Sequence, residues 1–254
     1  MRERETYDEQ RGGYMASVGK RFPNRWYVEL SGRLEDVRLN SLDHDAPPEV
    51  VEDKGDTFLA GPKLTFTRDR TDSRWLPSTG DRFQFSIEQI VGGASFTEAV
   101  VDYRYYRTVW VDALDRKHIL AGRVTAGAIG GDAPVFERFY GGGIGSIRGF
   151  DYRGVSPRSN GTDEPIGGDF LFLAGGEYTF PLVGEQLRGV VFIDTGTVEE
   201  NFQVTSYRAA GGFGVRWVIP LLGQVPMSFD FGFPFSKDSQ DDTQIFSFSI
   251  GWTF

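Results

Sequence analysis

The end of the chain, Phe246–Phe254, reads FSFSIGWTF and decides the fold class. Aromatic and branched apolar residues occupy alternate positions, namely Phe246, Phe248, Ile250, Trp252 and Phe254. Successive side chains of a β-strand point to opposite faces, so this segment predicts a strand with one aromatic face and one small, polar face. Chain ends usually fray in water. A strand that ends the chain on an aromatic residue therefore favours a membrane-embedded barrel wall over a half-buried soluble sheet.

The same alternation extends over most of the chain, and helical periodicity is scarce. It predicts about eleven strands, most of them near the ~9–11 residues that a tilted membrane strand needs. No stretch approaches the ~18–20 consecutive apolar residues of a membrane helix. The predicted strands are Gly13–Lys20, Trp26–Arg38, Thr57–Arg68, Asp81–Ile90, Phe96–Val111, His118–Gly130, Phe170–Phe180, Leu187–Thr197, Ala209–Ile219, Pro226–Phe235 and Gln244–Phe254.

The connections between these strands tend to alternate in length, as in outer-membrane barrels with short periplasmic turns and longer outer loops. Two connections break the pattern, because Val91–Ser95 is short and Asp69–Gly80 is long. Composition agrees with a barrel: 22 phenylalanines and 33 glycines are present, and no cysteine. The net charge of -9 argues against nucleic-acid binding.

The longest connection, Gly131–Asp169, carries the sequence GGGIGSIRGF at Gly141–Phe150. A connection of this length is usually functional. A phosphate-binding glycine loop would need a strand before it and a helix after it. Here a polar, proline-containing stretch follows instead. We therefore expect a loop that folds back, packs closely through its glycines and presents Arg148.

This loop resembles the conserved sixth outer loop of the BamA/TamA/FhaC-type superfamily of outer-membrane insertases and translocases. The family hallmark is a V/I-R-G-F/Y tetrad, and here it reads Ile147, Arg148, Gly149 and Phe150, after Gly142 and Gly143. In the family the loop folds into the lumen of a sixteen-stranded barrel, and five strands follow it, the number predicted here.

Two strands after the loop extend the resemblance. LAGGEYTFPL places Glu177 where the family has a lumenal glutamate, and VVFIDTGTV places Phe192, Asp194 and Gly196 in the family's F-x-D-x-G pattern. The resemblance implies that Arg148 pairs with Glu177 and Asp194. Guanidinium and carboxylate groups can pair through two hydrogen bonds, which suits a partly desolvated lumen.

Two further segments are similar to the family. Asp69–Glu88 resembles a turn between barrel strands, and the closing strand resembles the C-terminal assembly signal. The chain is shorter than a sixteen-stranded barrel requires and has no room for the periplasmic POTRA domains that usually precede it. We expect one domain, residues 1–254, which is either the C-terminal part of such a barrel or a smaller barrel that closes differently.

Three other functions would require different features of the sequence. A hydrolase would need His44 or His118 beside a serine and an acid, and neither local sequence shows a nucleophile elbow. A calcium site in Asp238–Asp242 or Asp43–Asp53 lacks EF-hand spacing, so solvated loop tips are expected there. A passive porin remains an alternative, as does a barrel that anchors an outer-membrane enzyme.

The sequence thus predicts an all-β transmembrane antiparallel barrel in a bacterial outer membrane. By resemblance it assists insertion of outer-membrane proteins or translocation of polypeptides, without enzymatic chemistry. The expected partners are outer-membrane lipid, client outer-membrane or secreted polypeptides, and lipoproteins of an assembly machinery. No cofactor, metal or nucleic acid is expected.

Overall fold

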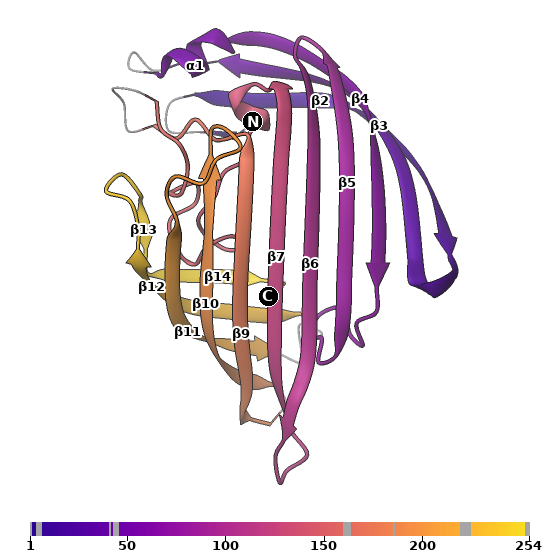
Figure 1. Cartoon of the computed structure of the whole chain (residues 1–254), viewed down its shortest axis with the longest axis vertical. Helices are drawn as coiled ribbons and strands as arrows, with labels where there is room; N and C mark the ends of the chain where they lie inside the picture. The colour runs from indigo at the N-terminus through magenta and orange to yellow at the C-terminus, as the bar shows by residue number, and fades with distance from the viewer. Residues whose placement is uncertain are drawn as a thin grey trace.

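The computed structural model of the chain describes residues 2–3, 7–40, 42, 46–159, 164–184, 186–218 and 225–251. One antiparallel sheet of twelve strands dominates them, in the order β1-β2-β3-β4-β5-β6-β7-β9-β10-β11-β12-β14, and it curls around an interior (Figure 1). Its strands are β1 (Arg2–Glu3), β2 (Asp8–Phe22), β3 (Trp26–Asn40), β4 (Gly55–Asp69), β5 (Gly80–Gly92), β6 (Ser95–Val111), β7 (Lys117–Asp132), β9 (Phe170–Val183), β10 (Leu187–Glu199), β11 (Arg208–Val218), β12 (Pro226–Ser236) and β14 (Phe246–Ile250).

The remaining elements are short. β8 (Gly149–Phe150) and β13 (Thr243–Gln244) form a separate two-stranded sheet, which packs against β11 and β12 of the large sheet. The helical turns are η1 (Pro23–Arg25), α1 (Pro48–Glu52) and η2 (Val135–Glu137). In the described part of the chain, no helix is long and apolar enough to cross a membrane.

In most strands, alternation of buried and exposed positions separates an inner face from an outer face. In β10, Phe192 and Asp194 are buried, whereas Val191 is 46% exposed and Ile193 53% exposed. Burial in this strand follows strand parity and not polarity, because a carboxylate lies inside and aliphatic side chains lie outside. An apolar outer face with charged residues on the inner face is the arrangement of a barrel that faces lipid.

The predicted fold class is confirmed, and the first ten predicted strands coincide with β2–β7 and β9–β12, most of them longer than expected. The prediction of one continuous strand over Gln244–Phe254 is wrong in its first part. Thr243 and Gln244 pair with Phe150 and Gly149 of the loop, and only β14 pairs with β12. The loop supplies the backbone partners at this point, so the strand changes neighbours at Ile245. Trp252 and Phe254 lie outside the described residues.

The two ends of the large sheet are β1–β2 and β14. In the described ranges, no backbone pairing joins these ends to each other. The β2–β3 hairpin bends away from the rest of the wall (Figure 1). Residues 10–22 of β2 are exposed on both faces, with Tyr14 at 84%.

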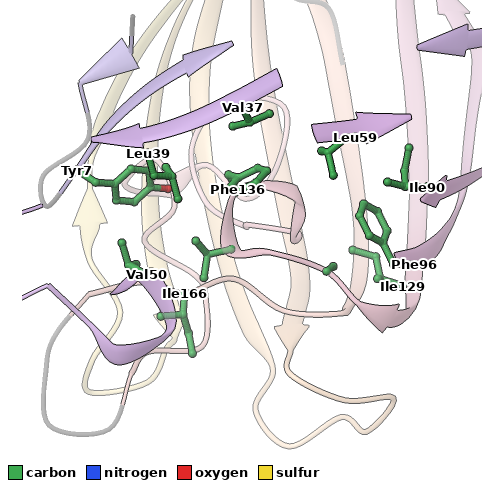
Figure 2. Packing of buried hydrophobic residues seen from close by; sticks show 12 residues of the cluster. Tyr7, Val37, Leu39, Val50, Leu59, Ile90, Phe96, Ile129, Phe136 and Ile166 are labelled. Atoms are coloured by element: carbon green, nitrogen blue, oxygen red, sulfur yellow. The ribbon is translucent and has the colours of Figure 1, made fainter. Parts of the chain in front are cut away.

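A hydrophobic cluster lies where the long loop and α1 meet the inner face of the strands. Val50 of α1, Phe136 of η2 and Ile166 of the loop pack with Val37 of β3 and Leu59 of β4 (Figure 2). Burial of these apolar side chains, about 1.5–3 kcal/mol for each large one, fixes the first part of the loop inside the sheet. The described residues of this part of the loop therefore pack against the strands.

Candidate functional site

The tip of the long loop is built on glycines with left-handed backbone. Gly142 and Gly143 have φ of 97° and 79°, and Gly149 has φ of 93°. Side chains larger than hydrogen are strained at such angles. The turn is closed by the amide of Gly143, which donates to the carbonyl of Phe150 at 3.0 Å. This turn places Arg148 on the inner face of the C-terminal strands.

Arg148 binds two carboxylates on neighbouring strands. Its Nε donates to Asp194 Oδ2 at 2.7 Å and its Nη2 to Asp194 Oδ1 at 3.1 Å. Its Nη1 donates to Glu177 Oε2 at 2.7 Å. The side chain of Arg148 is 6% exposed, that of Asp194 is 0% exposed and that of Glu177 is 5% exposed. The structure thus brings together the residues that the sequence had suggested as partners.

The strand motif contributes a platform as well as an acid. The guanidinium carbon of Arg148 lies 3.5 Å from the ring centroid of Phe192, so the cation stacks on the aromatic face. A desolvated contact of this kind contributes about 2 kcal/mol. Gly196 lies further along β10, and a Cβ there would meet the carbonyl oxygen of Phe172 at 2.3 Å. Only glycine fits at this position without a shift of the backbone.

Three charged residues of the cluster were missed by the sequence reasoning. Arg216 of β11 donates to Glu177 Oε2 at 2.9 Å and to Asp230 Oδ1 at 2.7 Å. Arg123 of β7 lies with Nη2 3.5 Å from Asp194 Oδ1 and also donates to the carbonyl of Ser146. A signal for these three residues was available in the sequence. Arg123, Arg216 and Asp230 are charged residues at alternate positions of strands whose outward-facing side chains are mostly apolar.

In the described part of the chain, the ion pairs around Arg148 join three guanidinium groups with three carboxylates, and the formal charges of these six groups cancel. The members of this cluster are Arg123, Arg148, Arg216, Glu177, Asp194 and Asp230. Buried charges are tolerated when they are paired and hydrogen-bonded. Removing one member leaves an uncompensated charge and costs about 3–5 kcal/mol. Such a cluster can hold a loop in one position.

A glycine of β12, also missed by the sequence reasoning, lets the loop tip approach. A Cβ at Gly232 would lie 2.5 Å from the backbone nitrogen of Gly149. The backbones of the loop and of β12 are therefore in direct contact. Ile147 and Phe150, 0% and 1% exposed, anchor the tip in an apolar cluster with Leu173 of β9.

The C-terminal residues lie at a different place from the loop tip. Phe246, Phe248 and Ile250 are 46%, 43% and 62% exposed on the outer face of β14. Rings of β12 pack beside them, with Phe229 5.0 Å from Phe248 and Phe231 5.3 Å from Phe246, centroid to centroid. This aromatic strip belongs to the lipid-facing surface and to one end of the sheet.

His118, the candidate hydrolase histidine that the structure describes, packs among aromatic side chains. His118 Nδ1 lies 2.7 Å from the hydroxyl of Tyr178, and its ring lies 4.4 Å from that of Trp110. His44 falls outside the described residues, as do Asp43 and Asp45.

The expectation of a solvated loop tip at Asp238–Asp242 is wrong for Asp241, whose side chain is 2% exposed and binds Arg208. In the part of the chain that the structure describes, no group of three or more metal-ligating residues is found.

Two acids in and beside α1 also bind the long loop through hydrogen bonds. Glu49 accepts a hydrogen bond from Ser159 Oγ at 2.7 Å. Asp53 accepts one from the amide of Val135 at 2.7 Å, and burial raises the pKa of the Asp53 carboxyl. A small cavity of about 40 Å³ is lined by Glu177, Arg216 and, from the β4–β5 turn, Pro77.

Comparison with known proteins places this geometry in a family. A family model, the Omp85 superfamily domain, matches residues 2–254. Outer membrane protein assembly factor BamA of Nitratidesulfovibrio vulgaris is 34% identical over 238 residues, which cover 87% of this chain and 29% of that protein. BamA of Neisseria meningitidis serogroup B is 27% identical over 230 residues, covering 74% of this chain and 28% of that protein. The chain thus spans less than a third of the length of these relatives.

Two solved structures share the fold. BamA from Haemophilus ducreyi lacking POTRA domains 1–3 matches with a TM-score of 0.82 at 15% identity, over 95% of this chain and 54% of that one. CdiB from Acinetobacter baumannii matches with a TM-score of 0.66 at 16% identity, over 95% of this chain and 41% of that one. With the family model matched from residue 2 to residue 254, the chain belongs to the Omp85 superfamily and is a β-barrel protein of the bacterial outer membrane.

Proposed function

We propose that residues 1–254 form one membrane-embedded barrel domain. This domain assists the insertion of outer-membrane proteins into the bacterial outer membrane, or the translocation of polypeptides across it. The observation that carries the proposal is the loop tip bound inside the sheet through Arg148, Glu177 and Asp194. The relative at 34% identity is named an outer membrane protein assembly factor, which supports the same assignment.

The proposed mechanism is non-enzymatic and uses backbone hydrogen bonding. The two ends of the sheet carry strand edges, and an exposed edge can accept an incoming strand by β-augmentation. β14 provides one such edge, and Phe246, Phe248 and Ile250 lie on its outer face. The partners are outer-membrane lipid, client outer-membrane or secreted polypeptides, and lipoproteins of an assembly machinery.

The test is an insertion assay with the chain reconstituted in phospholipid vesicles. A urea-unfolded outer-membrane β-barrel protein is added, and its folding is followed by protease protection and by its altered migration on unheated gels. We expect faster folding than in empty vesicles and than in vesicles that hold an unrelated passive porin. Equal rates in all three vesicles would contradict the proposal.

The same vesicles separate the proposed function from a passive porin and from an enzyme anchor. The packed loop predicts low, unsteady conductance in a planar bilayer. A large, steady conductance without client stimulation would favour the porin. Mass spectrometry of the client after insertion is expected to show no covalent change, as required of a non-enzymatic factor.

A further inference from the structure

A second ion cluster lies at the root of the same loop, far from Arg148 in the sheet order. Glu137, the last residue of η2, receives a hydrogen bond from Arg33 Nη2 of β3 at 2.6 Å. It receives another from Arg11 Nη1 of β2 at 2.7 Å. The Glu137 side chain is 9% exposed, so both arginines meet one largely desolvated carboxylate.

Neighbouring contacts make this cluster specific to the N-terminal strands. Arg33 Nε donates to Glu88 Oε1 of β5 at 2.7 Å, which fixes the orientation of its guanidinium. Arg11 Nη2 donates to the carbonyl of Phe136 at 2.9 Å, so η2 is bound through its backbone as well. Phe136 itself packs among the strand residues shown in Figure 2.

The loop is thus bound at two separate places. Its root is bound to β2 and β3 by Glu137, and its tip is bound to β9 and β10 by Arg148. The tip also pairs with β13, directly before β14. In the described ranges the two ends of the sheet are not paired to each other. The loop therefore connects the strands near one end of the sheet with the strands near the other, through the interior.

We propose that the loop acts as an internal brace that sets the separation between the two ends of the sheet, and that Glu137 is the positioning residue at its N-terminal attachment. This goes beyond the proposed function, because the separation is a property of the chain with no client present. Charge matters here as well as shape, since the Glu137 carboxylate is the loop's ion partner for both arginines. On the strands, Arg11 also pairs with Glu9, and Arg33 with Glu35 and Glu88. A neutral amide in place of Glu137 accepts a hydrogen bond from one arginine and turns a donor towards the other.

The experiment measures the separation directly. The chain has no cysteine, so cysteines introduced at Tyr14 of β2 and Phe235 of β12, 84% and 66% exposed, carry spin labels without side reactions. Pulsed electron paramagnetic resonance then gives the distance distribution in phospholipid vesicles. The doubly labelled parent is expected to give one narrow distribution, and Glu137→Gln a broader one shifted to longer distances.

Further variants make the result decisive. Glu137→Asp keeps the charge and is expected to recover most of the parental width. Arg11→Gln removes one of the two donors and should give intermediate broadening, which also covers the case in which Glu137→Gln folds poorly. Glu200→Gln removes an exposed loop carboxylate outside the cluster and should leave the distribution unchanged.

The outcome that overturns the brace is a parental distribution in both Glu137→Gln and Arg11→Gln. A fall in unfolding midpoint with an unchanged distribution would show that Glu137 only stabilises the fold. The insertion assay is scored separately. A broadened distribution in a chain that does not accelerate client folding supports the brace and contradicts the proposed function.

Discussion

The guanidinium of Arg148 and the carboxylate of Asp194 pair through two hydrogen bonds, 2.7 Å from Nε to Oδ2 and 3.1 Å from Nη2 to Oδ1. The backbone amide of Arg148 also donates to Asp194 Oδ2 at 3.2 Å. One side chain of β10 therefore fixes both the backbone and the head group of the loop arginine. Because Asp194 is 0% exposed, water does not compete for these bonds.

Replacing Arg148 is expected to destabilise the fold without removing its strands. Arg148→Ala leaves Asp194 and Glu177 with less positive charge around them, and we expect a loss of about 3–5 kcal/mol in the free energy of unfolding. Urea unfolding in detergent, with circular dichroism as the readout, measures this change. Arg74→Ala, at an exposed position in the β4–β5 turn, is the matched control. A loss no greater than in the control would contradict the role of Arg148.

Exchanging the two charges is expected to recover little of that loss. In the double variant Arg148→Asp with Asp194→Arg, the new arginine at position 194 faces Arg123, whose Nη2 lies 3.5 Å from the present carboxylate. The new aspartate at position 148 faces Glu177 and Asp230. A double-mutant cycle on the free energy of unfolding tests this. Recovery of half or more of the single-variant losses would show that the pair is independent of its neighbours.

Gly232→Ala is expected to push the loop tip away from β12. The added methyl would lie 2.5 Å from the nitrogen of Gly149, and overpacking of this kind costs about 1–3 kcal/mol. Limited trypsin digestion checks the displacement, because cleavage after Arg153 in the same loop should become faster. Gly211→Ala, whose nearest contact is 3.6 Å, should digest at the parental rate. Parental digestion of Gly232→Ala would mean that the contact is not close in solution.

The turn between β6 and β7 is expected to show a carboxyl that titrates at unusually low pH. The hydrogen bond from the side chain of Arg116 and the amides of Arg116 and Leu114 lower the pKa of Asp112 from 3.8 to about 2. With the folded pKa depressed, the carboxylate stabilises the turn above pH 3.8 and loses this effect as the pH falls through about 2. The carboxyl carbon shift in a nuclear magnetic resonance titration gives the midpoint.

Arg116→Gln is the control for the Asp112 titration. It removes the side-chain donor and keeps the two backbone donors. The midpoint of Asp112 is therefore expected to move up, towards the ordinary range, without reaching it. A midpoint that does not move would assign the low pKa to the backbone amides alone.

Strand pattern and loop chemistry could be predicted because both depend on local sequence. Alternation predicted the strand Leu187–Thr197, in which Phe192 and Asp194 share one face. The glycines before Ile147 predicted a turn that only such residues form. Resemblance to the family then supplied Glu177 and Asp194 as partners of Arg148, because parity alone could not select them from the other acids.

The sequence by itself determined that the chain is a lipid-facing sheet with an arginine-bearing loop and an aromatic closing segment. Tertiary structure alone decided which further inward charges join Arg148, Glu177 and Asp194. Arg123, Arg216 and Asp230 join the cluster because cross-strand register and sheet curvature, which sum over many strands, bring them to one level. The same curvature brings Glu137 within hydrogen-bonding distance of Arg11 and Arg33. It also allows Thr243 and Gln244 to pair with the loop residues Phe150 and Gly149 in place of β12. Period-two alternation fixes the face of each side chain, whereas contacts between distant strands depend on the geometry of the whole sheet.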